Sequence, residues 1–72
     1  MGQLARPSVA EAAAMKDYRA SLEKLRRDAA EAALIRDLAT DVGKREMFNR
    51  LYEHFSRLAD EVEQAMNALK TI

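Results

Sequence analysis

The sequence predicts an all-α protein in which two helices fold back on each other as an antiparallel hairpin. Three observations support this prediction. Alanine, leucine, glutamate, arginine and lysine dominate the chain, as they do in long helices. Apolar residues recur at spacings of three and four in two separate stretches. Between these stretches, "LATDVGKREMF" (residues 38–48) combines good helix-capping residues with one of only two glycines.

The first helix is predicted over residues 9–39, because a start signal precedes it. Pro7 disfavours helical conformation in the residues before Ser8. Ser8 and Glu11 have the spacing of a capping box, in which each side chain accepts a hydrogen bond from the backbone amide of the other residue. Residues 1–7 are therefore expected to form a flexible tail ahead of the hairpin.

The apolar stripe of the first helix changes direction near Ala33. Its first part follows one narrow face and consists of Met15, Tyr18, Leu22, Leu25, Ala29 and Ala32. Leu34, Ile35 and Leu38 then lie toward the opposite side of the helical wheel. Either the helix bends near Ala33, or its last turns face a different neighbour from its first turns.

Residues 40–42 are predicted to form the turn. Thr40 and Asp41 both suit the N-cap position, and Asp41 is the better candidate for starting the second helix. Gly43 would then lie in the first helical turn, whereas in a helix interior it would cost ~1 kcal/mol relative to alanine. The alternative, one long helix kinked at Gly43, leaves the change in direction of the apolar stripe unexplained.

The second helix is predicted over residues 42–70, within a hairpin that extends over residues 8–72. Its apolar stripe steps by three and four residues through Phe48, Leu51, Phe55, Leu58, Val62, Ala65, Leu69 and Ile72. A further row at a seven-residue period consists of Tyr52, Ala59 and Met66. This stripe is wider than the seam of a two-stranded coiled coil, so we expect the helix to contact more than one neighbour.

Charged residues suggest how the two helices align. Acidic residues are concentrated in the later half of the second helix, toward the negative end of its helix dipole. This placement is unfavourable, so we expect basic residues of a neighbouring helix to compensate it. Folding the chain back at Asp41 is expected to place Asp60 and Glu63 beside Lys16 and Arg19.

Part of the chain also matches a known sequence pattern, roughly A-T-D-P-x-x-R-x-x-L-x-x-L-A-x-x-W-x-x-L-A. The positions that match are Asp41, Arg45, Leu51, Leu58 and Ala59, with Phe48 in place of a leucine and Phe55 in place of the tryptophan. With this pattern, residues 39–63 resemble a family of short, uncharacterised alpha-proteobacterial proteins. Val42 replaces the proline and Tyr52 replaces a small alanine. The resemblance implies a helical hairpin and no chemistry, because the family has no established activity.

Composition disfavours several classes of function. The chain has no cysteine and one histidine, which excludes disulfides, thiolate metal sites and histidine-rich metal sites. Twelve basic residues balance twelve acidic ones, which argues against a protein built to hold nucleic acid or an anionic membrane. No apolar run is long enough for a membrane span, and "MGQLARPS" lacks the apolar core of a secretory signal. We therefore expect a cytoplasmic protein without a cofactor.

His54 is the one obvious candidate for catalysis or metal binding. Its helical neighbours are Arg50, Arg57 and Leu58, none of which is a common metal ligand. Ser56 points elsewhere on the helix, so no set of nucleophile and base can be assembled from local spacing. We expect no enzyme, and we interpret His54 as a histidine at the edge of an interface, with a pH-sensitive contact as the functional alternative.

The densest basic run of the chain offers a second functional hypothesis. Its members are Arg19, Lys24, Arg26 and Arg27. They could contact phosphate groups in a small nucleic-acid-associated regulator. The simpler interpretation is a solvated helix face, because Glu23, Arg27 and Glu31 have the spacing of helical ion pairs.

The function that the sequence favours is association with another protein through apolar helix faces. A chain this short buries only ~60% of its unfolded surface, and without disulfides or a metal a partner chain is the remaining means of stabilisation. We expect a homodimer that forms a four-helix bundle, with a larger protein as the alternative partner. The residues predicted to form the core or interface are Tyr18, Leu22, Leu25, Leu34, Ile35, Leu38, Phe48, Leu51, Tyr52, Phe55, Leu58, Val62, Met66 and Leu69.

Overall fold

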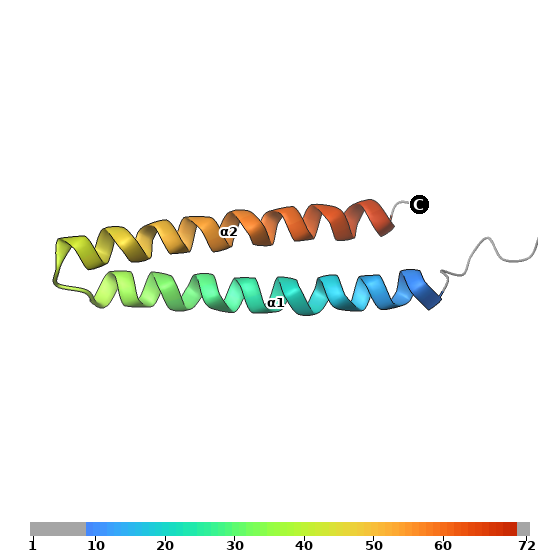
Figure 1. Cartoon of the computed structure of the whole chain (residues 1–72), viewed down its shortest axis with the longest axis horizontal. Coiled ribbons are helices and arrows are strands. Elements are labelled where there is room, and N and C mark those ends of the chain that lie inside the picture. The colour runs from blue at the N-terminus through green and yellow to red at the C-terminus, as the bar shows by residue number, and fades with distance from the viewer. Residues whose placement is uncertain (1–8, 71–72) are drawn as a thin grey trace, which may run out of the picture.

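The computed structural model shows two long helices that lie side by side in opposite directions (Figure 1). It describes the backbone of residues 9–70 and the side chains of residues 13–70. Helix α1 extends over Val9–Leu38 and helix α2 over Val42–Lys70. The prediction of an all-α antiparallel hairpin is therefore confirmed. The proposed tail and Ser8 lie outside the described residues, as does the side chain of Glu11, so the predicted capping box is not described.

The turn forms because both helix ends find hydrogen-bond partners locally. At the end of α1, the backbone N–H of Ala39 donates to the carbonyl oxygens of Ile35 at 3.0 Å and Arg36 at 3.3 Å. At the start of α2, the carboxylate of Asp41 accepts a hydrogen bond of 2.8 Å from the backbone N–H of Lys44. This is the contact of an N-cap residue, so Asp41 starts α2 as the sequence predicted.

Gly43 lies in the first turn of α2 without a left-handed backbone conformation. A Cβ atom at this position would lie 3.2 Å from Oδ2 of Asp41, so the capping carboxylate would have to shift slightly. Alanine also has an opposite, stabilising effect. It allows the unfolded chain fewer conformations than glycine does, which favours folding by ~0.4–1 kcal/mol. We therefore expect Gly43→Ala to change the free energy of unfolding by no more than about 1 kcal/mol in either direction.

Urea unfolding followed by circular dichroism would measure this change. Asp41→Ala is the matched control, since it removes the capping oxygen and should lower the free energy of unfolding by about 1 kcal/mol. A loss well above 1 kcal/mol for Gly43→Ala would show that the capping carboxylate cannot move aside.

The line along which the two helices touch is covered mainly by small side chains. The buried residues, each less than a tenth exposed, are Ala29, Ala32, Ala39, Ala59 and Met66. Ala59 is completely buried, whereas no larger side chain among the described residues falls below 2% exposure. Alanine at these positions allows the backbones to approach closely.

The large apolar residues predicted to form the central core are each half-buried. They are Leu22, Leu25, Leu51, Phe55, Leu58 and Val62. Two helices touch along only one line, and a large side chain next to that line keeps one side open to water. The interior of the single hairpin is therefore built from alanine, and the leucines border it.

Several predicted core or interface residues are exposed in the hairpin. Leu34 and Leu38 are 58% and 72% exposed, as expected for side chains that face away from α2. Tyr18 is also exposed, although it belongs to the stripe that continues toward the buried alanines. Helix α1 continues without interruption through Ala33, so the last turns of α1 present a second apolar face rather than a separate helix.

The partners of Asp60 and Glu63 differ from those predicted by counting back from Asp41. Among the described side chains, neither makes an ion pair with Lys16 or Arg19. Instead Nη2 of Arg26 lies 3.2 Å from Oδ1 of Asp60 and 2.7 Å from Oε1 of Glu63. Side chains of an α-helix lean toward its N-terminus, so those of α1 lean away from the turn and those of α2 toward it. The long side chain of Arg26 therefore meets residues of α2 that lie further from the turn than counting predicts.

Candidate interaction surface

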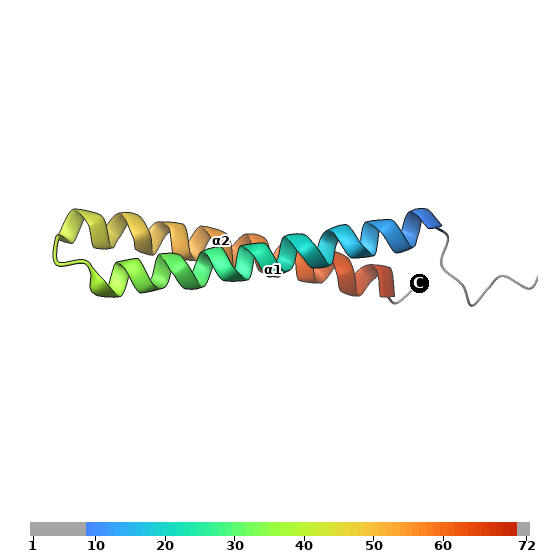
Figure 2. The ribbon, with the colours of Figure 1, turned by 90° about the horizontal axis from the view of Figure 1, so that it is seen from below.

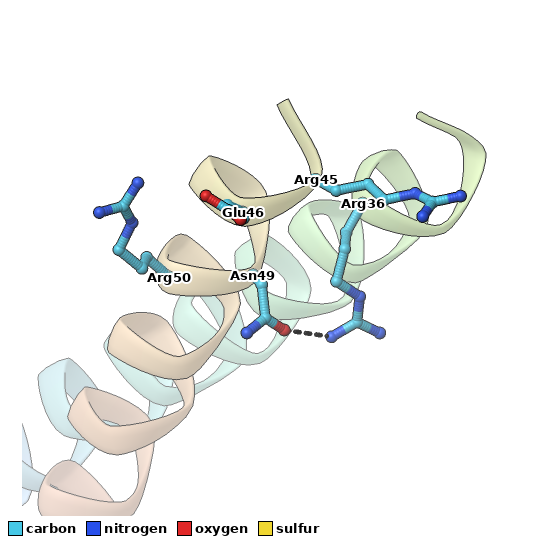
Figure 3. Close-up of a pocket in the computed structure, with 5 residues that line it drawn as sticks. All are labelled: Arg36, Arg45, Glu46, Asn49 and Arg50. Atoms are coloured by element: carbon cyan, nitrogen blue, oxygen red, sulfur yellow. Dashed lines mark hydrogen bonds between the residues drawn. The ribbon is translucent and has the colours of Figure 1, made fainter. Parts of the chain in front are cut away.

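Arg36 joins the two helices near the turn. Its Nη1 donates a hydrogen bond of 2.9 Å to Oδ1 of Asn49 on α2 (Figure 3), and its Nε donates to Oδ1 of Asp37 at 3.0 Å. The guanidinium carbon lies 4.9 Å from the centre of the Tyr52 ring, which is a cation–π contact. Asn49 in turn donates from Nδ2 to Oε1 of Glu53 at 2.8 Å. These contacts hold α2 at a defined height against α1.

A shallow hollow of about 480 Å³ lies beside this contact. Figure 3 shows that its lining comes from the turn ends of both helices, with the residues Arg36, Arg45, Glu46, Asn49 and Arg50. Two of the three arginines already bind protein groups, because Nε of Arg45 donates to the carbonyl oxygen of Ala39 at 3.0 Å. A carboxylate also belongs to the lining, and no described side chain leaves a buried polar atom unsatisfied. The hollow is thus explained by contacts that fasten the turn.

The polar contacts between α1 and α2 all lie on the same side of the buried alanine line. We call this side the closed seam; its residues are Arg26, Arg36, Asn49, Asp60 and Glu63. Each residue of an α-helix is turned by 100° around the helix axis from the one before it. By this rule, Arg26 and Arg36 project to the same side of the buried alanines of α1. Asn49, Asp60 and Glu63 project to the corresponding side of the buried residues of α2. The closed seam is therefore already bridged by charged and polar groups of the chain itself.

The opposite side of the helix contact carries apolar residues of α2, whereas α1 contributes Ile35 and the half-buried Asp28, which pairs with Lys24 of its own helix. We call this side the open seam and define it by Ile35 of α1 and by Met47, Leu51, Leu58, Ala65 and Leu69 of α2. Five of these six are half-buried, and Met47 is 53% exposed. Within the described residues, no ion pair or side-chain hydrogen bond joins α1 to α2 across this side. Figure 2 shows the two helices crossing at a shallow angle, so the seam follows the length of the hairpin.

The predicted core and interface residues divide among these surfaces. Ile35, Leu51, Leu58 and Leu69 belong to the open seam, while Phe48, Tyr52 and Met66 lie nearer the closed side or on the contact line. Sequence reasoning missed Met47, although its spacing of four residues from Leu51 is a helical signal. It also missed the contact between Arg36 and Asn49, for which the sequence carries no local signal.

The basic run does not gather on one surface. Arg26 is engaged by Asp60 and Glu63, and Nζ of Lys24 lies 3.4 Å from Oδ2 of Asp28. The helical pairs expected for Arg27 are not among the ion pairs of the described side chains. Because the four basic residues point in different directions around α1 and two have acidic partners, they form no continuous patch for phosphate.

His54 is exposed on α2, and its ring centre lies 6.1 Å from that of Phe55 at a tilt of 48°. In the part of the chain that the structure describes, no three histidine, cysteine, aspartate or glutamate side chains are grouped so that they could bind a metal ion.

In comparisons with known proteins, no family model, curated protein or solved structure matches the chain. The resemblance of residues 39–63 to the alpha-proteobacterial family therefore stays a prediction. Neither described helix contains an apolar segment of the length that a membrane span requires.

Proposed function

We propose that this protein is an association module, in which two copies of the hairpin pair through apolar helix faces to form a four-helix bundle. The observation that carries the proposal is the placement of the large apolar side chains. In a single hairpin the leucines of α2 are half-buried, and Leu34, Leu38, Val42 and Met47 are more than half exposed.

The energetic argument follows from this placement. Each Å² of apolar surface removed from water contributes ~25 cal/mol, and a contact line made of alanines removes little of it. A second hairpin would cover side chains that the first leaves open to water. Symmetric pairing is the commonest way for a chain to do this with its own surface, and a larger protein that presents an apolar face is the alternative partner.

The mass of the protein in solution tests this proposal. Light scattering on a size-exclusion column should give twice the chain mass of 8.1 kDa. Folding and association would be coupled, so the melting temperature should also rise with protein concentration. A folded species of 8.1 kDa whose melting temperature is independent of concentration would contradict the homodimer.

A pair of variants makes the test specific to a surface. Leu58→Glu places a charge in the open seam and should shift the mass toward that of one chain. Ala30→Glu adds the same charge at an exposed position of α1 outside both seams, and should leave the mass unchanged. Equal behaviour of the two variants would contradict association through the apolar faces.

A further inference from the structure

We infer that the second copy docks on the open seam with its turn at the same end of the bundle. This inference rests on the proposed function and specifies its geometry. The two-fold axis runs along the hairpin, so that α1 of each copy packs beside α2 of the other. Charge, height along the helices and the exposed apolar residues all support this arrangement.

Charged residues on the two sides of the hairpin differ in whether they have partners. On the closed seam, Arg26 and Arg36 bind acidic or amide groups of the same chain. Toward the open seam, Glu61 is exposed and makes no ion pair with any described residue, and Lys24 is exposed with only Asp28 of its own helix as a partner. These side chains are available to a partner beside the open seam.

The contact between Arg36 and Asn49 shows, to within about one helical turn, which residues of α1 and α2 share a height. Equal steps along both helices from this contact bring Lys24 level with Glu61. A two-fold axis along the bundle preserves heights, because it moves each residue around the axis without moving it along the axis.

In this arrangement opposite charges meet at the edges of the new interface. Lys24 of one copy lies level with the partner's Glu61, and this pair occurs twice because of the symmetry. The contact between Lys24 and Asp28 within the chain is exposed and 3.4 Å long, so Lys24 can exchange one partner for the other.

The exposed apolar residues near the turn fit the same geometry. Equal steps from the Arg36–Asn49 contact bring Leu38 level with Met47. These side chains are 72% and 53% exposed in one hairpin. Both lie toward the open seam on their helices, so Leu38 of each copy can pack against the partner's Met47. The other two-fold arrangement, with the turns at opposite ends, pairs α1 with α1 and α2 with α2, and therefore brings none of these residues together.

The position of the two turns distinguishes the arrangements. The natural chain has no cysteine, so Thr40→Cys introduces a single site for a spin label at an exposed turn position. Pulsed electron paramagnetic resonance on the dimer should give a short distance between the two labels. Labels separated by about the length of a helix, ~45 Å, would overturn the inference while leaving the proposed dimer intact. A monomer by light scattering would overturn both.

Exchange of charges tests the pairing itself. Lys24→Glu or Glu61→Lys alone should raise the dissociation constant of the dimer by about tenfold at low salt, because each change creates two like-charge contacts. The double variant should restore most of the affinity. Arg19→Glu is the control, since it makes the same charge change at an exposed residue away from the open seam. Single variants that behave like this control, or a double variant weaker than either one, would overturn the assignment of Lys24 to the partner's Glu61.

Discussion

Replacing Phe55 with alanine is expected to lower the free energy of unfolding by about 3 kcal/mol, at the lower end of the range for a phenylalanine in a protein core. Phe55 lies in the middle of the apolar stripe of α2 and is half-buried in one hairpin. Its removal loses the transfer free energy of the ring and leaves a space that the alanine-rich face of α1 cannot fill. A loss of this size approaches the whole stability of many domains of this length.

Urea or thermal unfolding by circular dichroism would measure the effect of Phe55→Ala. For a chain of this length, a loss of 3 kcal/mol corresponds to a fall in melting temperature of more than ~12 °C. Phe55→Leu is the matched control, because it keeps most of the apolar volume and should cost less than about 1.5 kcal/mol. If Phe55→Ala melted within a few degrees of the parent protein, Phe55 would not contribute to the core.

Enlarging Ala59 is the second change with a large expected effect. Ala59 is completely buried on the face of α2 that meets α1, where Ala29 and Ala32 of α1 are 6% and 4% exposed. The larger side chain of Ala59→Leu has no space unless the helices separate. Overpacking of this kind costs ~1–3 kcal/mol, and we expect a loss of about 3 kcal/mol because two backbones, rather than flexible side chains, limit the space.

The same substitution at an exposed position supplies the control for Ala59→Leu. Ala30→Leu changes α1 by the same atoms where no neighbour is displaced, so its effect should stay within about 0.5 kcal/mol. Denaturant unfolding of both variants at one protein concentration would compare them directly. Equal stabilities would mean that the helices are not in close contact at Ala59.

The turn could be predicted from the sequence because its determinants are neighbours in the chain. Asp41 lies three residues before the amide that it caps, and the change in direction of the apolar stripe occurs on both sides of the same short segment. The width of the stripe on α2 similarly indicated that one neighbouring helix would not cover it. The open seam consists mainly of the part of this stripe that α1 leaves half-exposed.

The candidate surface could be predicted only in part, because the sequence does not contain the heights of the two helices relative to each other. The predicted partners of Asp60 and Glu63 were wrong by more than one helical turn, and Arg36 was not singled out at all. Both errors have the same origin, since these contacts depend on how far a long arginine side chain extends along the neighbouring helix, which residue spacing within one helix does not specify.

By itself, the sequence determined the two helices, their boundaries to within a residue at the turn, and the apolar faces that each helix presents. These follow from contacts between residues three or four apart, which the order of amino acids specifies directly. Only the tertiary structure decided that alanines rather than leucines are the most deeply buried residues, and that Arg26 and Arg36 bridge the two helices on one side. Those features depend on the distance, rotation and height of one helix against the other, and many distant side chains set these three quantities together.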